Sequence, residues 1–510
     1  MKKFPYIGLD QHGLTSLMVD GNPWMGLAGE LKNSSSSNSK YMEEKVWPNL
    51  STLGLDTVLL PVAWESIEPE EGQFQYDLVD EILAQARKNN IRLVLLWFGL
   101  WKNGESMYVP LWVKRDPERF ILAQHQFVGR SVSISPLCQP AIEADAKAFK
   151  KLMAYLRQVD GEMHTVLMVQ VENEIGFLGS EYDHSPLAEE AFGQMIPNVL
   201  AEAFNKQGTW SEAFGEDGPE YFMAWHYASA VERIIQAGKT EFPLPMFVNA
   251  WLEQHPTYPG YYPSGGPIAR LIPLWKLAAP SIDLYAPDVY VSDFFQACQD
   301  YSILKNPLLL PEVRRDPVTA SNAFYAFGHH KAILFSPFGI DEFVDYLEYK
   351  PNTALLAELN IDLESFNCAG TSPYLISSYR LLRNARPFLL SNRDKMGGFI
   401  KRSNHDRGCI LHGHECDLII SYQDSLPGKP GSAGIWMELE TNTFMLMGCR
   451  FSVEPIQKRN TSKRVISLRL EEVTFERGEM LIGRILNGDE RGHMICGDTA
   501  SCFKMTVGYV

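Results

Sequence analysis

The sequence lacks the features that mark several classes of protein. No stretch approaches the roughly 18 consecutive apolar residues of a membrane span, and the opening residues, MKKFPYIGLDQHGLTS, lead into no apolar segment of a secretory signal. We therefore expect a cytoplasmic protein with no membrane partner. The eight cysteines form no CxxC pair and no zinc-type spacing. This pattern favours buried, reduced thiols over disulfides and predicts no bound metal.

Positive charge is also scarce. The chain carries 46 Lys and Arg against 62 Asp and Glu, a net charge of −16, which argues against a nucleic-acid partner. In contrast, hydrophobic residues make up 45% and aromatic residues 12% of the chain, as in well-cored globular proteins. At 510 residues, two or three domains are expected. Association into a homo-oligomer is left open.

Short apolar runs alternate with longer amphipathic stretches from residue 24 to about residue 338. This alternation is typical of repeated βα units. Eight such units over more than 300 residues predict a (β/α)₈ barrel. The alternative is an open doubly wound sheet, but no glycine-rich nucleotide-binding turn follows the first run. The eight runs are Trp24–Glu30, Thr57–Trp64, Ile91–Gly99, Thr165–Glu172, Met246–Trp251, Ile282–Tyr290, Pro307–Glu312 and Ala332–Pro337.

The stretches between the runs predict helices, and the end of the chain predicts strands. After about residue 396 the apolar residues alternate with a period of two, and Asn487-Gly488 has the composition of a hairpin turn. We therefore expect a barrel domain over residues 1–390 and a small β-sandwich or jelly-roll domain over residues 391–510. The clearest helical stretches are Asp77–Lys88, Asp145–Arg157, Leu187–Asn205, Tyr221–Ala237 and Ile268–Leu277.

Two glutamates stand where apolar runs end. Glu174 follows the fourth run in the string VQVENEIG, and Glu312 closes the seventh run, 138 positions later, in LLLPEVRRD. In a barrel of parallel strands, the carboxyl ends of the strands carry the chemistry. Two carboxyl groups at this edge suit the cleavage of a glycosidic bond, in which one donates a proton and the other faces the sugar carbon. Glu174 and Glu312 are therefore the predicted catalytic pair.

Neighbouring residues support this interpretation. Asn173 stands beside Glu174 and can hydrogen-bond a sugar 2-hydroxyl. A nucleophilic carboxylate has to stay ionised, and Arg314 and Arg315 directly after Glu312 are expected to lower its pKa. Tyr290, at the end of the sixth run, is expected to donate its hydroxyl to Glu312.

Aromatic side chains also stand at or just beyond the ends of predicted strands. A flat ring can cover the apolar C–H face of a sugar while the hydroxyl groups stay free for polar partners. At least one ring is therefore expected to form a sugar platform, and Trp251 is the first choice. The four candidates are Trp64, Trp97, Trp101 and Trp251.

Four strings, taken together and in this order, resemble glycoside hydrolase family 35 or a close relative in the same clan of retaining (β/α)₈ enzymes. They are DGNPWMGLAGELKNSSSS, LLPVAWESIEPEEGQFQYD, VQVENEIG and LPEVRRD. The tail phrase GRILNGDE is similar to the β-rich C-terminal domain on one bacterial branch of the beta-galactosidase-like members. The resemblance implies that Glu174 is the acid/base, that Glu312 is the nucleophile and that Asn173 contacts the 2-hydroxyl. It also implies a mechanism with net retention and without a metal or organic cofactor.

The sequence departs from this family around the third strand. Typical beta-galactosidases of the family carry a Gly-Pro-Tyr and an Ala-Glu motif there, whereas this chain reads LLWFGLWKNGE. Lys102 and Asn103, together with Glu30 at the end of the first run, are therefore counted among the substrate contacts. We expect a retaining exo-beta-glycosidase, with a beta-galactoside as the first choice of substrate. The alternatives are a beta-glucoside-specific hydrolase, a transglycosylase and a non-catalytic carbohydrate-binding relative.

Overall fold

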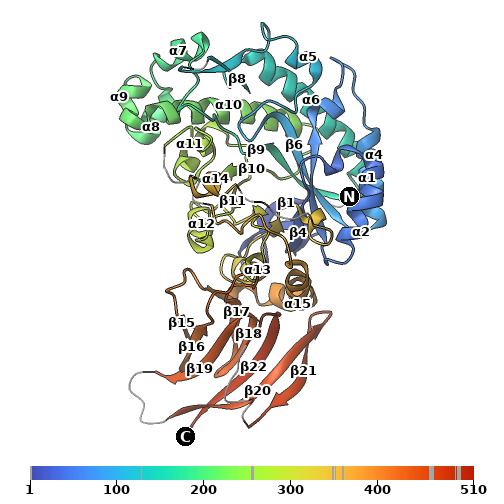
Figure 1. The fold of residues 1–510 in the computed structure, drawn as a ribbon, viewed down its shortest axis with the longest axis vertical. Helices are drawn as coiled ribbons and strands as arrows, with labels where there is room; N and C mark the ends of the chain where they lie inside the picture. Colours follow the sequence, from blue (N-terminus) through green and yellow to red (C-terminus); the bar gives the residue numbers. More distant parts are fainter. Residues whose placement is uncertain are drawn as a thin grey trace.

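The structure is a computed structural model of the chain. It describes residues 3–127, 129–253, 258–346, 350, 352–358, 361–458, 464–488, 490 and 496–510. Figure 1 shows a large α/β part above a smaller part made of strands. No helix of the described part is both long and apolar enough to cross a membrane.

The larger part is a closed barrel of eight parallel strands, which confirms the predicted (β/α)₈ fold (Figure 1). Each strand contains residues of one of the eight apolar runs, because a parallel strand covered on both faces is apolar almost throughout. In order around the barrel they are β4 (Gly26–Glu30), β5 (Thr57–Ala63), β6 (Arg92–Lys102), β9 (Val166–Asn173), β10 (Met246–Trp251), β11 (Leu284–Val289), β12 (Leu310–Val313) and β13 (Leu334–Pro337).

A small antiparallel sheet precedes the barrel. Its strands are β1 (Tyr6–Leu9), β2 (Thr15–Val19) and β3 (Asn22–Trp24), and β3 ends two residues before β4 begins. Leu17 and Val19 of β2 belong to the same buried cluster as residues of seven barrel strands. The sheet therefore covers the amino-terminal end of the barrel and leaves the opposite end for chemistry.

Three of the predicted helices appear as single elements around the barrel. They are α4 (Asp77–Lys88), α6 (Gln139–Asp160) and α10 (Gly218–Lys239). The predicted helix over residues 187–205 is instead two helices, α7 (Pro186–Phe192) and α8 (Asn198–Phe204), because Gly193 and Pro197 interrupt it. The helix expected from Ile268 begins with a 3₁₀ turn and continues as α11 (Ile272–Ala278). The shorter helices are α1 (Ser39–Tyr41), α2 (Trp47–Leu50), α3 (Trp64–Ile67), α5 (Leu111–Lys114), α9 (Trp210–Phe214), α12 (Phe294–Asp300) and α14 (Thr353–Glu358).

The C-terminal strands form two antiparallel sheets, as expected for a β-sandwich. One sheet has the order β14-β17-β18-β22-β20-β21 and the other the order β15-β16-β19. Apolar residues of both sheets meet in one buried cluster, which is the core of the sandwich. The strands are β14 (Gly397–Ile400), β15 (Gly408–His412), β16 (Cys416–Tyr422), β17 (Ala433–Glu440), β18 (Thr443–Cys449), β19 (Phe451–Gln457), β20 (Val465–Glu476), β21 (Glu479–Leu486) and β22 (Ser501–Tyr509).

The prediction of a hairpin turn at Asn487-Gly488 is wrong. The chain leaves β21 there and returns as β22, which pairs with β18 and β20 instead. The tight hairpin is at Arg477-Gly478, between the paired residues Glu476 and Glu479. Both turn residues have positive φ, 49° and 87°, as a two-residue type I′ turn requires.

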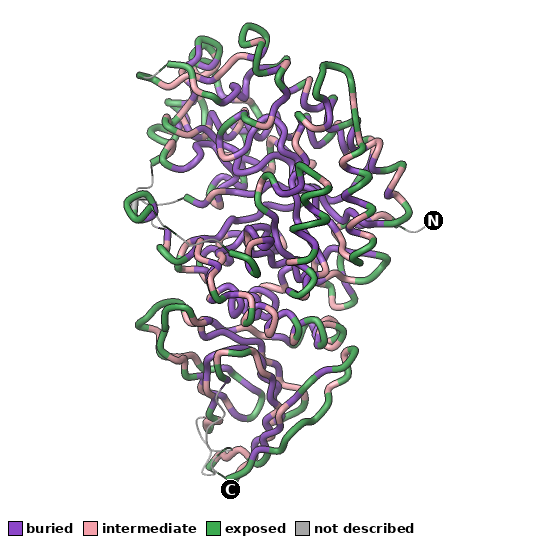
Figure 2. Tube along the Cα trace, turned by 45° about the vertical axis from the view of Figure 1, so that its right-hand side comes forward, coloured by how far each residue is buried: buried purple, intermediate pink, exposed green. Residues whose placement is uncertain are grey.

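Two helices join the barrel to the sandwich. α13 (Val318–Gly328) contacts β14 and β17, and α15 (Ser372–Ser391) contacts β20 and β21 (Figure 1). Nearly every residue of α13 is buried, because the helix is covered by the barrel on one side and by the sheet on the other. Figure 2 shows this buried layer continuing from the barrel into the upper sandwich. The division into two domains after residue 390 stays a prediction. The elements named from Gly397 onward in the described part of the chain, β14 to β22, are strands.

None of the eight cysteines forms a disulfide in the structure, and seven of them are buried.

Candidate active site

Four carboxyl side chains gather at the carboxyl-terminal ends of the barrel strands. Glu30 ends β4, Glu174 follows β9, Asp288 lies in β11 and Glu312 lies in β12, paired directly with Asp288. The two predicted catalytic glutamates therefore stand at the ends of the fourth and seventh strands of the barrel. All four side chains are buried, and the charge of each ionised carboxylate acts on its neighbours.

Glu174 is held in an unusual backbone conformation. Its φ is +44°, a region in which non-glycine residues are uncommon. Its backbone N–H donates a hydrogen bond of 3.0 Å to Oδ1 of Asn249 on β10, and Nδ2 of Asn249 donates one of 2.6 Å to Oδ2 of Asp288. Residues of three neighbouring strands thus hold the backbone of Glu174 in place.

The environment of Glu174 raises its pKa to about 7. Burial is the largest cause, because it disfavours the charged carboxylate, and the negative charge of Glu312 is the second. Lys102, Asp288 and Asn103 act in the opposite direction. A carboxyl group with a pKa near neutrality can both donate and accept a proton under ordinary conditions.

Glu312 has a different environment. The hydroxyl of Tyr290 donates a hydrogen bond to its Oε1, as expected from the sequence. The other oxygen, Oε2, is buried and has no hydrogen-bond partner among the described residues. Burial raises the pKa of Glu312, while the positive charge of Lys102, the Tyr290 hydroxyl and the neighbouring Glu30 side chain lower it.

The expectation that Arg314 and Arg315 act on Glu312 is wrong. Arg314 binds the carboxylate of Asp316 at 2.5 Å and 3.0 Å, and Arg315 binds Glu342 at 2.7 Å. Both guanidinium groups therefore stabilise the segment after β12. The cation that acts on Glu312 comes from another strand, as Lys102 at the end of β6.

Lys102 reaches the site because a tight turn follows it. The backbones of Lys102 and Glu105 exchange hydrogen bonds of 2.8 Å and 3.0 Å, with Asn103 and Gly104 between them at φ of 52° and 70°. This is the Asn-Gly sequence that a type I′ turn prefers. The backbone N–H of Asn103 also donates a hydrogen bond to the backbone carbonyl of Asn173, at 3.1 Å. The third-strand segment is thereby tied to the strand that carries the acid.

Asn173 is buried beside these carboxyl groups. Neither its Oδ1 nor its Nδ2 has a partner in the described part of the chain. Both oxygens of Glu30 and Oδ1 of Asp288 are likewise buried, and their side chains meet other carboxyl groups, Glu30 against Glu312 and Asp288 against Glu174. Buried polar groups are normally hydrogen-bonded, so the unpaired amide of Asn173 among these carboxyl groups is typical of a site that a polar ligand completes.

A second pair of acids lies on the outer side of the barrel wall. Glu172, which strand alternation turns away from Asn173, accepts hydrogen bonds from the amides of Leu100 and Trp101 at 3.1 Å and 2.7 Å. Asp145 of α6 accepts from the Leu100 amide and from the indole of Trp97. Burial raises the pKa of Asp145 to about 6 and raises that of Glu172 well above its ordinary range, where the charge of Asp145 adds to the effect. The pair fixes β6 against β9.

Three of the four predicted sugar platforms are structural, so the prediction is wrong for Trp64, Trp97 and Trp101. Each is 0% exposed, and no ring face is open to a ligand. Each indole N–H is bonded inside the protein, to Glu68, to Asp145 and to the carbonyl of Ile134, respectively. Trp251, at the end of β10, stays partly exposed and is still a candidate.

The sequence interpretation missed Asn249, Asp288 and Asp145. Asn249 and Asp288 lie inside the fifth and sixth apolar runs, and an amide or a carboxyl group well inside such a run was a signal that went unused. Asp145 opens a predicted helix, and its contacts depend on packing that no local pattern reveals.

Two parts of the chain match known family models. Residues 40–218 match the model described as beta-galactosidase, of glycoside hydrolase family 42, and residues 375–496 match a domain of unknown function, DUF5597. The first match includes Glu174. No curated protein matches the chain.

Several solved structures are similar to the chain at low identity. A beta-galactosidase from Rahnella sp. R3 has a TM-score of 0.42 and 15% identity, over 61% of this chain and 50% of its own. A beta-galactosidase from Bacillus circulans sp. alkalophilus has a TM-score of 0.46 and 11% identity, over 95% and 99%. The exo-beta-1,4-mannosidase Op5Man5 from Opitutaceae bacterium strain TAV5 has a TM-score of 0.39 and 14% identity, over 73% and 62%. The chain thus spans half the length of the Rahnella enzyme.

The family match shows a similarity to glycoside hydrolases over residues 40–218. The barrel and the carboxyl groups at its rim suit the chemistry of that class of enzyme. The matching model is described as beta-galactosidase, which agrees with the broader part of the resemblance found in the sequence. Membership of family 35 itself is not shown; the matching model is that of family 42.

Proposed function

We propose that this protein is a retaining beta-glycosidase that removes a terminal beta-linked sugar, with a beta-galactoside as its first substrate. Glu174 is the acid/base and Glu312 the nucleophile. The observation that carries the proposal is the contrast between the two groups. Burial raises the pKa of both groups and Lys102 lowers both, but the charge of Glu312 also raises the pKa of Glu174, to about 7. Glu312 instead accepts the Tyr290 hydroxyl, which favours its ionised form.

The reaction follows from these assignments in two steps. In the first, Glu312 attacks the anomeric carbon while Glu174 donates its proton to the oxygen of the leaving group, and a covalent glycosyl-enzyme forms. In the second, Glu174, now ionised, takes a proton from water, and the water oxygen replaces the Glu312 ester. Two displacements at one carbon give net retention.

Loss of the Glu312 charge in the covalent intermediate assists the second step. That charge is the second largest cause of the raised Glu174 pKa, so the pKa falls when the ester forms. Glu174 then stays ionised and can act as a base. The same residue thus suits both steps because its partner changes charge between them.

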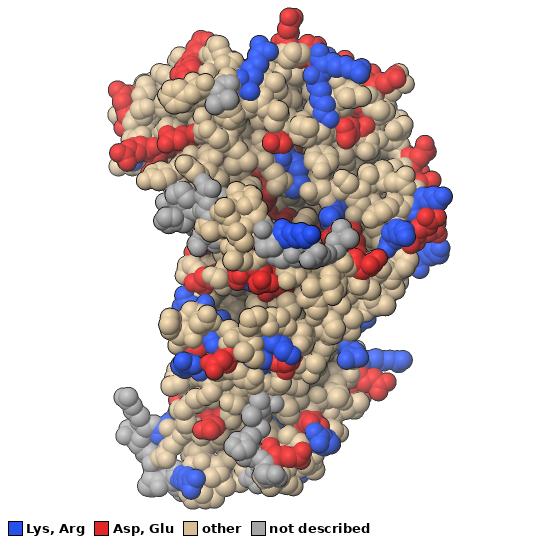
Figure 3. All heavy atoms as spheres, viewed as in Figure 1, with Lys and Arg blue, Asp and Glu red and all other residues tan. Residues whose placement is uncertain are grey.

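The polar groups of the site are assigned to the sugar. Asn173 is the contact for the 2-hydroxyl, and Glu30, Lys102 and Asn103 are contacts for other hydroxyl groups. Trp251 is the candidate platform for a sugar ring. Figure 3 shows positive and negative side chains interspersed over the visible face, without a broad basic area, which suits an uncharged substrate.

The choice of sugar depends on the third-strand turn. Lys102 and Asn103 replace the motif by which typical family 35 members grip galactose, so a beta-glucoside is the second candidate. Transfer of the sugar to an acceptor sugar uses the same intermediate and is the other alternative.

Initial rates on a panel of alpha- and beta-nitrophenyl glycosides test the proposal, with Glu312→Ala as the paired variant. We expect turnover of the beta-galactoside by the wild type, loss of turnover in the variant, and recovery with azide to give an alpha-glycosyl azide. Turnover of the beta-glucoside alone would show that the substrate is a glucoside and would leave the proposed mechanism unchanged. If no glycoside reacts, even with acceptor sugars present, the proposal fails.

A further inference from the structure

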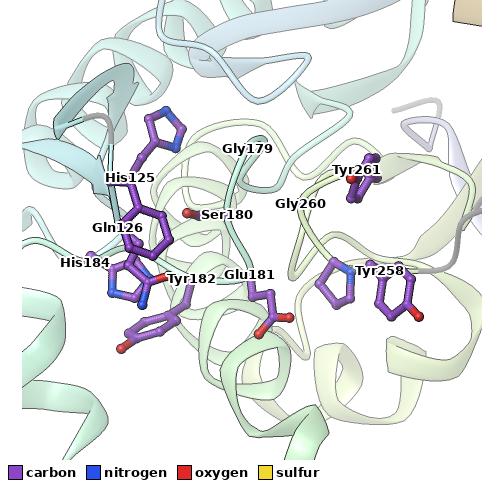
Figure 4. A pocket seen from close by; sticks show the side chains of 12 residues that line it. His125, Gln126, Gly179, Ser180, Glu181, Tyr182, His184, Tyr258, Gly260 and Tyr261 are labelled. Atoms are coloured by element: carbon purple, nitrogen blue, oxygen red, sulfur yellow. The ribbon is translucent and has the colours of Figure 1, made fainter.

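A cleft of about 580 Å³ lies near the rim of the barrel, outside the cluster of carboxyl groups. One wall is the hairpin between β7 (Leu122–His125) and β8 (Gly129–Ile134), and the other is the segment Tyr258–Tyr261. Figure 4 shows His125, Gln126 and His184 on one side, Tyr258 and Tyr261 on the other, and Glu181 between them. We refer to it as the tyrosine cleft.

The segment that carries Glu174 leads directly into the tyrosine cleft. Phe177 and Ser264 exchange backbone hydrogen bonds of 2.9 Å each, and the amide of Gly179 donates to the carbonyl of Gly260 at 2.8 Å. Gly179 stands five residues after Glu174, and five residues span at most about 18 Å. The cleft therefore begins within that distance of the acid/base.

This position matters because of what Glu174 does. The acid protonates the oxygen of the leaving group, so the leaving part of the substrate lies on the side of the acid. A substrate with several sugars beyond the scissile bond would extend from Glu174 toward Gly179 and the tyrosine cleft.

The lining of the cleft suits uncharged sugars. Tyr258 is 64% and Tyr261 is 52% exposed, so both present rings to solvent at the wall of a cleft. Such rings can cover the C–H faces of sugars. The carboxylate of Glu181 offers an acceptor for hydroxyl groups, and Nδ1 of His125 is buried without a partner among the described residues. No Lys or Arg occurs among the lining residues that the structure describes, so an anionic chain finds no counter-charge there.

We propose that the tyrosine cleft is the leaving-group subsite and binds the sugar units beyond the scissile bond of a neutral beta-linked oligosaccharide. This inference rests on the proposed function and adds to it that the physiological substrate is an oligosaccharide rather than a small glycoside. Tyr261 stacks on a sugar ring, and Glu181 accepts hydrogen bonds from its hydroxyl groups.

A second cleft provides a matched control. It has a volume of about 1030 Å³, lies beyond Glu30 along the segment that follows β4, and contains Tyr41, which is 49% exposed. Tyr41 and Tyr261 are thus similarly exposed tyrosines in two clefts, on different sides of the barrel opening. Comparing the alanine variant of each tyrosine shows which of the two clefts the leaving group occupies.

The kinetic experiment compares two substrates, 4-nitrophenyl beta-galactoside and beta-1,4-galactotetraose, or the glucoside and cellotetraose if the panel selects glucose. In Tyr261→Ala we expect the ratio of kcat/KM for the tetrasaccharide to that for the nitrophenyl glycoside to fall about tenfold, the scale of one lost ring contact. In Tyr41→Ala the ratio is expected to stay at the wild-type value. A fall in Tyr41→Ala instead, or an unchanged ratio in Tyr261→Ala, overturns the assignment.

A binding experiment separates this inference from the proposed function. In the Glu312→Gln protein, calorimetry measures the Kd of the tetrasaccharide and of the free monosaccharide. We expect tighter binding of the tetrasaccharide, and loss of that difference when Tyr261→Ala is added. Equal affinities, or a difference that survives Tyr261→Ala, contradict the inference even if the wild type hydrolyses nitrophenyl glycosides. Tetrasaccharide binding that depends on Tyr261, without turnover of any glycoside, supports the cleft and refutes the proposed function.

Discussion

Replacing Glu312 by glutamine is expected to lower the pKa of Glu174. The pKa of Glu174 is raised from an ordinary value of 4.5 to about 7, first by burial and then by the charge of Glu312. At about 1.4 kcal/mol per pKa unit, the rise represents ~3 kcal/mol of unfavourable free energy for the ionised form. Glutamine keeps the shape and burial of the site and removes only the charge, so the pKa falls by the part that the charge contributes.

Carbon-13 NMR of protein labelled at the glutamate side-chain carboxyl carbon measures this pKa directly. The Glu174 signal is assigned as the one absent from Glu174→Gln, and it is then followed with pH in wild type and in Glu312→Gln. Glu476→Gln, which removes an exposed charge from β20, is the control and is expected to leave the titration unchanged. An unchanged Glu174 pKa in Glu312→Gln would refute the electrostatic coupling on which the two-step mechanism depends.

The same pKa sets the pH dependence of activity and of stability. Glu174 donates a proton only while protonated, so kcat/KM is expected to fall as the pH rises above about 7. The folded protein also holds this proton more tightly than the unfolded chain does, so its contribution to stability is lost as the pH rises from about 4.5 to about 7. The melting temperature of Glu174→Gln minus that of the wild type is therefore expected to be more positive at pH 8 than at pH 4. A melting difference that is independent of pH would show that Glu174 titrates normally.

Three further substitutions test individual contacts. In Tyr290→Phe, kcat is expected to fall roughly 10- to 100-fold, because a hydrogen bond to the charged Glu312 contributes roughly 1.5–3 kcal/mol; an unchanged kcat would show that the hydroxyl has no role. In Asn173→Ala, kcat/KM is expected to fall for an ordinary glycoside and much less for its 2-deoxy analogue, and equal losses would contradict the assignment to the 2-hydroxyl. Glu172→Ala leaves buried amides of β6 without this acceptor and is expected to lower the free energy of unfolding by roughly 2–4 kcal/mol, measured by urea denaturation. Glu172→Gln can still accept a hydrogen bond, so its free energy of unfolding should fall less than that of Glu172→Ala. An equal fall in the two variants would show that the charge of Glu172, and not its role as an acceptor, stabilises the protein.

The barrel could be predicted from the sequence because its strands are buried on both faces. Such strands read as apolar runs bounded by polar residues, and the first and seventh runs end at Glu30 and Glu312. The helices were less regular: the stretch Leu187–Asn205 has an apolar pattern, but Gly193 and Pro197 divide it. The hairpin at Arg477-Gly478 was missed because Asn-Gly is the stronger signal for a turn, and the choice of partner strand is not local.

The candidate site was predictable only in part. Residues at strand ends meet at one edge of a parallel barrel, which is why Glu174, Glu312 and Tyr290 could be brought together from sequence alone. The cation that faces Glu312 could not be predicted. Arg314 is close to Glu312 in sequence but binds Asp316, whereas Lys102 stands at the turn after another strand. Whether a side chain at a strand end is exposed could not be predicted from the sequence either. Three buried tryptophans of the core therefore resembled sugar platforms in the sequence.

Trapping the covalent intermediate tests the central claim most directly. A 2-deoxy-2-fluoro beta-galactoside with a good leaving group, or the glucoside if the panel selects glucose, slows the second step, and peptide mass spectrometry then locates the bound sugar. The proposed mechanism predicts inactivation with one sugar per chain, attached through an ester to Glu312. A sugar attached to any other residue, or turnover that releases the inverted anomer without a trapped intermediate, would contradict it.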